Sequence, residues 1–289
     1  MKEPTFKIAI IGLGIIGGSM AYALHGFKGA KIAGCDINPE TRRKVLEARA
    51  VDEVFETPSS AIENADLVIL CVYPHLITKI IAENINSFKD GAVITDVCGV
   101  KTKLSKDITR ILPQGTTYVG GHPMAGKETD GFDSASPKLF DKCGYIITPI
   151  ERSTPDAMKL VADMARHIGA TRITTATPEE HDRVIAYTSD LMHISASALC
   201  LDYNPKMNLA YCAGAFRDCT RIANISPKLW SQLFIENKAF LLEELDSFIS
   251  SLNKFKSAIE NNDKAELEHL LAIVKKNKLT MQAKEPENY

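Results

Sequence analysis

Residues 7–17 read KIAIIGLGIIG, an apolar run that breaks at Gly12 into a Gly-x-Gly-x-x-Gly pattern. The residues before Gly12 predict a buried β-strand, and those after Gly14 predict a helix. Each glycine has its own role: Gly12 permits a tight turn, Gly14 lets the backbone approach a pyrophosphate, and Gly17 lets helix and strand pack closely. The free amides and positive dipole end of such a helix attract phosphate. The stretch therefore predicts a dinucleotide-binding strand, turn and helix.

An acidic residue follows at the distance that this motif requires. Asp36 closes the predicted strand 31–35, where a carboxylate accepts hydrogen bonds from the adenosine ribose. The carboxylate would repel a 2′-phosphate, so we expect NAD rather than NADP as the cofactor, although Arg42 and Arg43 soften that preference. The expected cofactor-binding residues are Gly12, Gly14, Ile15, Ile16, Gly17, Asp36 and, at the end of a later strand, Val72.

The first half of the chain alternates short apolar runs with amphipathic stretches, which is typical of a parallel sheet wrapped by helices. The predicted strands are 7–11, 31–35, 67–72, 92–95, 117–119, 145–148 and 171–174. Asn38-Pro39 and Thr154-Pro155 each place a capping side chain before a proline and so predict helix starts. After residue 174, Thr177 and Glu180 form a capping box that predicts a helix to about Leu201, Ser226-Pro227 opens another, and Asp263 with Glu266 caps a last helix. We expect a Rossmann-type, doubly wound, mostly parallel α/β domain over 1–176 and an all-helical substrate and dimerisation domain over 177–289.

The last helices carry an apolar stripe. Apolar side chains recur at three- and four-residue steps at Leu245, Phe248, Leu252, Phe255 and Ile259. A helical domain of this size has few elements with which to cover such a stripe, so we expect a homodimer through these helices. The alternative is packing within the chain alone.

Composition excludes several classes of protein. The 289 residues are 45% hydrophobic and 24% charged with a formal net charge of -2, which fits a globular protein and lacks the basic footprint of a nucleic-acid binder. The seven cysteines never form Cys-x-x-Cys, so we expect no zinc site or other metal and no disulfide framework, and a cytoplasmic location fits best. Residues 8–24 imitate a signal peptide, but their glycine spacing favours the nucleotide motif. No other segment approaches the length needed to cross a bilayer, and no membrane partner is expected.

A histidine follows the predicted strand 117–119. Residues 120–126 read GGHPMAG, in which Pro123 holds His122 extended and the glycines remove bulk around it. An imidazole at the carboxyl edge of this sheet lies beside the expected nicotinamide, where an enzyme that oxidises an alcohol needs a group to take the hydroxyl proton. A packing histidine is the alternative.

Three stretches together resemble the prephenate dehydrogenase family, including its arogenate-using relatives: GLGIIGGS at 12–19, GGHPMAG at 120–126 and FRDCTRIA at 216–223. The second and third are specific to that family, and the resemblance spans almost the whole chain. It implies that NAD takes a hydride from the ring carbinol of prephenate, the ring carboxylate leaves as carbon dioxide, and 4-hydroxyphenylpyruvate forms for tyrosine biosynthesis. Arogenate would give tyrosine directly.

The resemblance also implies residue roles. His122 takes the proton of the substrate hydroxyl as the hydride leaves. Prephenate is a dianion, and the family's substrate-binding arginine falls on Arg221, while Arg217 matches a neighbouring basic position. A guanidinium grips a carboxylate through two parallel hydrogen bonds, and these two residues share one face if the stretch is helical.

Further substrate contacts are expected from the long helix after Thr177. The resemblance places His193 in the substrate site, with Ser189 one turn before it and His181 nearby. His181 and His193 are twelve residues apart, which in an α-helix turns their side chains about 120° away from each other. We therefore expect only one of them in the substrate site and favour His193. Glu128, if it faces the substrate side chain, would favour the ammonium of arogenate over the keto acid of prephenate. Gly99 stands where several relatives have a serine that hydrogen-bonds the catalytic histidine, so the orienting contact must come from elsewhere.

Two other functions remain open on the residues alone. A 3-hydroxyacid dehydrogenase shares the expected architecture, but such enzymes rely on a lysine in the helical domain and leave the His-Pro-Met-Ala-Gly segment unexplained. A dinucleotide sensor without turnover would need neither the histidine nor the paired arginines.

Overall fold

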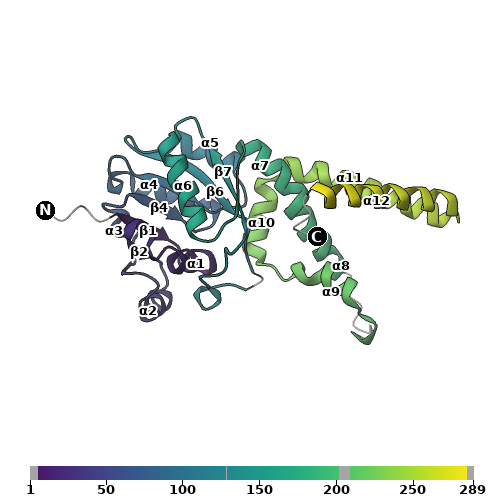
Figure 1. The fold of residues 1–289 in the computed structure, drawn as a ribbon, viewed down its shortest axis with the longest axis horizontal. Helices are drawn as coiled ribbons and strands as arrows, with labels where there is room; N and C mark the ends of the chain where they lie inside the picture. The colour runs from purple at the N-terminus through teal and green to yellow at the C-terminus, as the bar shows by residue number, and fades with distance from the viewer. Residues whose placement is uncertain (1–5, 128, 202–208, 285–289) are drawn as a thin grey trace. The chain divides into compact units, whose positions relative to one another are not determined.

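The structure, a computed structural model, describes residues 6–127, 129–201 and 209–284. The chain divides into two compact units, residues 1–238 and 239–289. Figure 1 shows the fold, with labels on the helices and on most of the strands. Glu128, predicted to face the substrate, lies outside the described residues.

The first unit is built on an eight-stranded sheet in the order β3-β2-β1-β4-β5-β6-β7-β8. The strands are β1 (Lys7–Ile11), β2 (Lys31–Cys35), β3 (Glu53–Phe55), β4 (Leu67–Leu70), β5 (Val93–Asp96), β6 (Thr117–Pro123), β7 (Gly144–Pro149) and β8 (Arg172–Thr175). Neighbouring strands are parallel except β6 and β7. The predicted doubly wound, mostly parallel sheet is therefore confirmed, and only the short edge strand β3 was not predicted.

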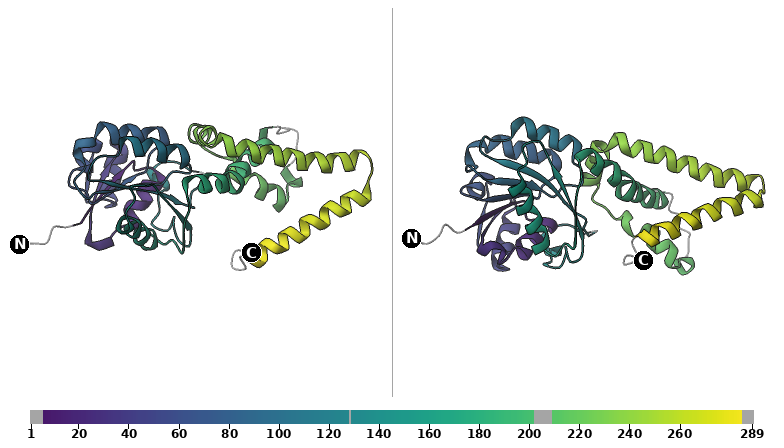
Figure 2. Two further views of the ribbon diagram at one scale, coloured as in Figure 1. Left: turned by 90° about the horizontal axis from the view of Figure 1, so that it is seen from above. Right: turned by 45° about the horizontal axis from the view of Figure 1, so that its top comes forward.

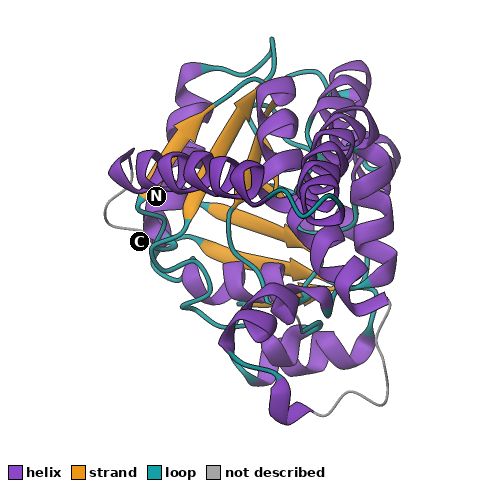
Figure 3. Ribbon diagram, turned by 90° about the vertical axis from the view of Figure 1, so that its right-hand side faces the viewer, coloured by secondary structure: helices purple, strands orange, loops and turns teal. Residues whose placement is uncertain are grey.

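Helices cover both faces of this sheet. One face is covered by α1 (Ile15–Ala23), α2 (Pro39–Glu47) and α6 (Pro155–His167), the other by α3 (Pro58–Ile62), α4 (Pro74–Glu83) and α5 (Thr102–Ile111). Successive side chains of a strand point to opposite faces, so Ile8 and Ile10 enter the first core and Ala9 and Ile11 the second. Figure 3 shows the strands, in orange, as the layer between the purple helices.

The predicted helix starts match the local hydrogen bonds. Asn38 accepts from the amide of Glu40, and Pro39 occupies the first helical position. Thr154 caps α6, and Thr177 and Glu180 complete the predicted capping box. These caps orient each chain segment as it leaves the sheet.

The rest of the first unit is helical. After β8 come α7 (Pro178–Ile185), a π-helical turn (Ala186–Asp190), α8 (Leu191–Leu201), α9 (Gly214–Thr220), the 3₁₀ turn η6 (Arg221–Ala223) and α10 (Pro227–Glu236). Shorter 3₁₀ turns are η1 (Phe27–Gly29), η2 (Ile85–Ser87), η3 (Phe132–Ser134) and η5 (Leu209–Tyr211). The predicted domain boundary at 176 falls between β8 and α7, whereas compactness divides the chain after Lys238, so that boundary stays a prediction.

One helical stretch corrects an expectation. Pro178–Leu201 is long and apolar enough to cross a membrane by length and composition alone, although the sequence predicts no such segment beyond residue 24. These two criteria do not separate a membrane span from an apolar helix of a water-soluble domain. His181, Asp182 and Asp190 lie buried within this stretch.

The second unit is a helical hairpin. Its first helix is α11 (Lys238–Glu260), and its second is α12 (Lys264–Lys284). The short turn between them contains Asn262, which adopts a positive φ of 53°. Asp263 caps α12 by accepting from the amide of Glu266, as its sequence position predicts. Figure 2 shows the chain reversing direction between these helices.

Candidate active site

The glycine pattern forms the turn between β1 and α1. Gly12 has a φ of 90°, and a side chain there would collide with the carbonyl oxygen of Cys71 and with Val72. A Cβ on Gly17 would lie 1.8 Å from the carbonyl oxygen of Gly12, so this position accepts only glycine. Among the described residues, no atom lies within 4 Å of a Cβ added at Gly14. The amino end of α1, whose first turn contains Ile15 and Ile16, is therefore open to a ligand.

Asp36 lies beside this turn at the end of β2. Its carboxylate accepts hydrogen bonds from the amides of Leu13 (2.9 Å) and Asn38 (2.8 Å), which leaves lone pairs for ribose hydroxyl groups. The open helix end and this carboxylate fit an adenine dinucleotide.

The two arginines behind Asp36 are engaged with protein oxygens. Arg42 donates to the carbonyl oxygens of Asp36 and Ile37 and pairs with Glu56. Arg43 pairs with two glutamates of its own helix, Glu40 and Glu47. Neither guanidinium is held toward a 2′-phosphate, so the structure gives no reason to offset the NAD preference that Asp36 predicts.

His122 lies at the carboxyl end of β6 and contacts α7. Its Nδ1 is 2.8 Å from Nε2 of His181, and Nδ1 of His181 is 2.7 Å from Oδ1 of Asp182. His181 and Asp182 are buried. The opposite edge of the His122 ring faces Gly99, where an added Cβ would lie 3.8 Å from Nε2. Three polar side chains thus form a line that ends at the imidazole of His122.

A buried ion pair holds the backbone next to His122. Lys101 and Asp96 are fully buried, and Nζ of Lys101 donates to Oδ2 of Asp96 at 2.5 Å. Nζ of Lys101 also donates to the carbonyl oxygen of Gly121 (2.7 Å), and Oδ1 of Asp96 accepts from the hydroxyl of Tyr118. A buried charge is tolerated when it is paired and hydrogen-bonded, and here the pair fixes the end of β6.

Burial controls the ionisation of this group. Burial lowers the pKa of His122 well below 6.5, and the neighbouring His181 and Lys101 lower it further. Burial also lowers the pKa of His181, against the opposing effect of Asp182. Burial would raise the pKa of Asp182, but hydrogen bonds from His181 and Thr102 outweigh it and leave that pKa below 3.8. Two neutral imidazoles and one carboxylate are therefore the forms at neutral pH.

His193 belongs to a different part of the same helical stretch. Its ring stacks on Trp230 of α10 with ring centroids 3.7 Å apart, and its Nδ1 donates to the carbonyl oxygen of Ser189 (2.9 Å). Ser189 thus contributes a main-chain oxygen here. The sequence favours His193 over His181 for the substrate site, whereas the hydrogen bond to His122 is made by His181.

The two predicted arginines lie on adjoining short helices. Arg217 is on α9, and Arg221 begins η6, which packs against α8. Both are exposed.

Helix α10 links these parts of the first unit. Leu233 of α10 lies beside Gly99, and Trp230, one turn earlier, stacks on His193. Figure 1 shows α7 and α10 next to the end of β6. The structure therefore groups His122, His181 and His193 around α7, α8 and α10, and places Arg221 against α8.

Four residues of this group were not among the predicted site residues: His181, Asp182, Lys101 and Trp230. The adjacent His181-Asp182 pair just after a helix cap was a usable signal, because a carboxylate beside an imidazole sets its tautomer. Lys101 gave no such signal, since burial of a lysine follows from tertiary packing.

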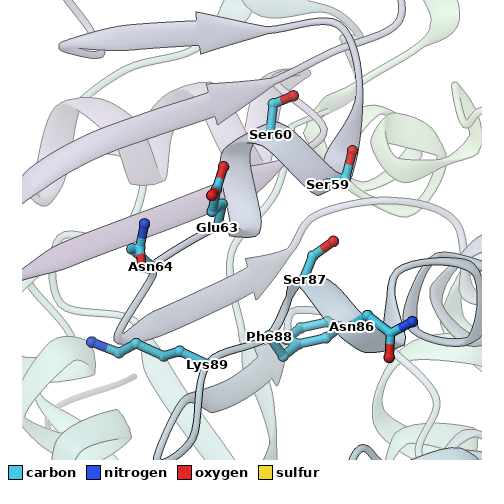
Figure 4. Close-up of a pocket in the computed structure, with 8 residues that line it drawn as sticks. All are labelled: Ser59, Ser60, Glu63, Asn64, Asn86, Ser87, Phe88 and Lys89. Atoms are coloured by element: carbon cyan, nitrogen blue, oxygen red, sulfur yellow. The ribbon is translucent and has the colours of Figure 1, made fainter.

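A separate cavity of about 400 Å³ lies at the other edge of the sheet. Figure 4 shows its lining residues, Ser59, Ser60, Glu63, Asn64, Asn86, Ser87, Phe88 and Lys89, which precede β4 and β5. Ligands of open α/β sheets bind at the carboxyl ends of the strands, so this cavity is not the candidate site.

Comparison with known sequences identifies two domains. Residues 21–174 match the family described as prephenate dehydrogenase, nucleotide-binding domain, and residues 177–273 match prephenate dehydrogenase, dimerization domain. The chain is similar to the prephenate dehydrogenase of Bacillus subtilis (strain 168), with 32% identity covering 91% of this chain and 72% of the relative. It is 35% identical to the cyclohexadienyl dehydrogenase of Zymomonas mobilis, with 90% of each chain covered.

Solved structures of a prephenate dehydrogenase and an arogenate dehydrogenase are also similar to this chain. The prephenate dehydrogenase of A. aeolicus, in complex with hydroxyphenyl propionate and NAD+, superposes with a TM-score of 0.85 at 32% identity over 97% of this chain and 100% of that one. Synechocystis arogenate dehydrogenase gives a TM-score of 0.80 at 28% identity, covering 96% and 100%. The likeness to 3-hydroxyisobutyrate dehydrogenase from Salmonella typhimurium, at 14% identity and a TM-score of 0.57, shows a shared fold alone.

Proposed function

Because the chain belongs to the prephenate dehydrogenase family, we propose that it oxidises prephenate to 4-hydroxyphenylpyruvate and carbon dioxide in tyrosine biosynthesis. It is an NAD-dependent oxidoreductase of the group that includes prephenate, arogenate and cyclohexadienyl dehydrogenases. Prephenate rather than arogenate as the substrate is the specific proposal, and it is tested by comparing the rates with the two compounds.

The order of residues along the sheet edge carries this proposal. Strands β2, β1, β4, β5 and β6 are successive neighbours in the sheet. At or just beyond their carboxyl ends lie, in the same order, Asp36, Gly12, Val72, Gly99 and His122. Adjacent strands lie about 4.8 Å apart, so roughly 14 Å separates the ends of β1 and β6. A dinucleotide with its ribose at Asp36 and its pyrophosphate at Gly14 would extend along this edge toward His122.

The chain's own residues then divide the work of the reaction. NAD, when bound, accepts the hydride from the ring carbinol. His122 takes the hydroxyl proton as the hydride leaves, because a neutral imidazole is the base available at this edge. Loss of the ring carboxylate as carbon dioxide leaves an electron pair in the ring, and the same imidazole returns its proton to the oxygen of the product. No proton is gained or lost overall.

Two arginines are proposed to hold the anionic substrate. Arg221 binds a carboxylate of prephenate, with Arg217 one helical turn before it. His193, which stacks on Trp230, and Ser189, whose carbonyl oxygen accepts from His193, are proposed to contact the same substrate. Glu128 would act at the side-chain end of the substrate, and arogenate is the second candidate because a solved arogenate dehydrogenase shares this fold at 28% identity.

A homodimer and a cytoplasmic location complete the proposal. The match of residues 177–273 to a dimerization domain supports the dimer, as do exposed apolar side chains on α11 and α12. They are Leu242, Ile249, Leu252, Ile259, Leu271, Ile273, Val274, Leu279 and Met281. Exposed apolar rows of this extent mark an interaction surface.

The test is to follow NADH or NADPH formation with purified protein given prephenate or arogenate, each with NAD or NADP. We expect the highest kcat/KM with prephenate and NAD, and a fall in kcat of at least about 100-fold in His122→Asn. Higher kcat/KM with arogenate would reassign the substrate. Absence of reduced cofactor in all four combinations would reject the enzyme proposal.

A further inference from the structure

Within the described residues, the imidazole of His122 has a side-chain hydrogen bond on one edge only. At its Nε2 edge stands Gly99, which has no side chain, and within the described residues no hydrogen bond reaches Nε2. At its Nδ1 edge, Nε2 of His181 lies 2.8 Å away. The orientation of His122 therefore depends on His181.

Backbone amides fix the direction of the hydrogen bonds. Oδ1 of Asp182 lies 2.8 Å from the amide nitrogen of Lys101, and Oδ2 lies 2.7 Å from that of Thr102. An amide N–H can only donate, so both carboxylate oxygens are acceptors. Nδ1 of His181, which is 2.7 Å from Oδ1 of Asp182, must then carry a hydrogen and donate it.

The hydrogen-bond direction at Asp182 also fixes the direction at the imidazoles of His181 and His122. A neutral imidazole with its hydrogen on Nδ1 has its lone pair on Nε2. Nε2 of His181 is therefore an acceptor, and Nδ1 of His122 must donate to it. The remaining nitrogen of His122, Nε2, is left without a hydrogen and faces the space beside Gly99.

We infer that His181 and Asp182 are positioning residues that hold His122 in the tautomer with Nε2 as the proton acceptor. The role of that proton acceptor in turnover rests on the proposed function, whereas the tautomer does not. Lys101 connects the parts, since its amide holds Asp182 and its Nζ holds the carbonyl oxygen of Gly121, next to His122.

The same line of residues stabilises the charge that forms during the reaction. When Nε2 takes the hydroxyl proton, His122 becomes an imidazolium that still donates through Nδ1 to His181, and the carboxylate of Asp182 lies behind. The other charged groups near the ring, Lys101 and Asp96, pair with each other. Asp182 need not accept a proton to have this effect, because orientation and electrostatic attraction are sufficient.

Nitrogen NMR on the free protein tests the tautomer directly. Protein labelled with ¹⁵N-histidine gives distinct ring-nitrogen shifts for the two neutral tautomers. We expect the hydrogen on Nδ1 in both His122 and His181 at pH 7, with signals assigned from His122→Asn and His181→Gln. A hydrogen on Nε2 of His122 would overturn the inference, whether or not the protein turns over prephenate.

Two substitutions separate positioning from a merely structural role. His181→Met removes the acceptor, so we expect kcat to fall about 100-fold with the KM for NAD unchanged, and the His122 signal to become a mixture of tautomers. His181→Gln keeps an oxygen that accepts from Nδ1 and should recover kcat to within about tenfold of the wild type. His167→Gln, on the exposed end of α6, is the control and should change neither measurement.

Equal kcat in the two His181 variants, with equal loss of thermal stability, would mean that His181 only fills space. If the wild type forms no NADH with prephenate or arogenate, the proposed function fails, but the NMR result still decides the tautomer. The two failures are thus distinguishable.

Discussion

Burial keeps the imidazole of His122 neutral, which is the form that a general base needs. The surrounding protein and the charge of Lys101 both disfavour a second proton on the ring, so its pKa lies well below 6.5. A base with a lowered pKa is a weaker acceptor but remains available over a wider range of pH.

This shift predicts the acid side of the pH profile. The base is active when neutral and inactive when protonated, so activity is lost only as the pH falls through the lowered pKa of His122. We expect kcat/KM for prephenate to stay level from pH 8 down past 6.5 and to decline at lower pH. Steady-state rates measured between pH 5 and 8, with a check that the protein stays folded, would show this. A decline centred at or above pH 6.5 would contradict it.

The arginines should differ in effect. Arg221→Ala removes a proposed ligand of a substrate carboxylate, and a hydrogen bond to a charged group is worth about 1.5–3 kcal/mol, so KM for prephenate should rise roughly 10- to 100-fold. Arg217→Ala, four residues earlier, is the matched comparison and should raise KM less. Binding of NAD, measured by calorimetry, should be unchanged in both. A similar loss of NAD affinity would indicate a folding defect instead.

At the scale of secondary-structure elements, two glycines of the turn between β1 and α1 have different roles: Gly14 leaves space for a ligand, and Gly17 allows close packing. The methyl group of Gly14→Ala meets no atom of the described residues within 4 Å, so the protein should fold with its usual Tm, but this methyl group occupies the space expected for pyrophosphate. We expect the Kd for NAD to rise at least about tenfold. Gly17→Ala places a methyl group against the carbonyl oxygen of Gly12, and overpacking of this kind costs about 1–3 kcal/mol or more. Thermal melts with and without NAD distinguish the two variants; a lowered Tm in Gly14→Ala would disprove this division.

Asp190 of the π-helical turn is a buried carboxyl that contacts Asn237, the residue after α10. Burial raises the pKa of Asp190 to about 6, although the amide of Asn237 donates to it (2.7 Å), and Asp182 raises it further. Oδ1 of Asn237 is buried and, within the described residues, has no hydrogen-bond partner. A protonated Asp190 could donate to that oxygen, which a carboxylate cannot.

Asp190→Asn should therefore stabilise the protein at neutral pH. The folded-state pKa of about 6 exceeds the usual 3.8, so in the wild type stability is gained as the pH falls from above 6 toward 3.8 and is missing at pH 7. The amide removes this charge and supplies a donor for Asn237. We expect a gain of about 2 kcal/mol at pH 7.5 that shrinks to roughly a third of that size near pH 4.5, measured as the difference in Tm between variant and wild type. An equal difference at both pH values would rule out titration of Asp190.

The sequence was sufficient to predict those features of the structure that depend on residues close together in the chain. The glycine turn and the caps at Asn38, Thr154 and Thr177 depend on residues a few positions apart, and each formed as predicted. The contact between His122 and His181 spans 59 residues, and the predicted angle of about 120° between His181 and His193 assumed a regular α-helix. The π-helical turn at Ala186–Asp190 lies between them and breaks that regularity.

At the scale of the whole molecule, the strand order and the helical stretch after β8 act together. The sheet arranges the expected cofactor residues along one edge from β2 to β6, and α7 returns to that edge with His181 and Asp182. A single strand end could not supply a nucleotide turn, an acidic ribose partner and a held imidazole. The proposed dehydrogenase activity is thus a property of the assembled edge.

The apolar face of the second unit leads to the last prediction. Leu252 is 51% exposed and Ile259 62% exposed, and both belong to the stripe predicted from sequence. Burying such side chains against a second copy would stabilise a dimer by about 25 cal/mol per Å² of apolar surface, whereas charges there would oppose it. We expect Leu252→Lys combined with Ile259→Lys to shift the protein from dimer to monomer in sedimentation analysis. Ser250→Lys adds a single lysine on the opposite side of α11 and should leave the dimer intact. A dimer that persists in the double variant would place the interface on another surface.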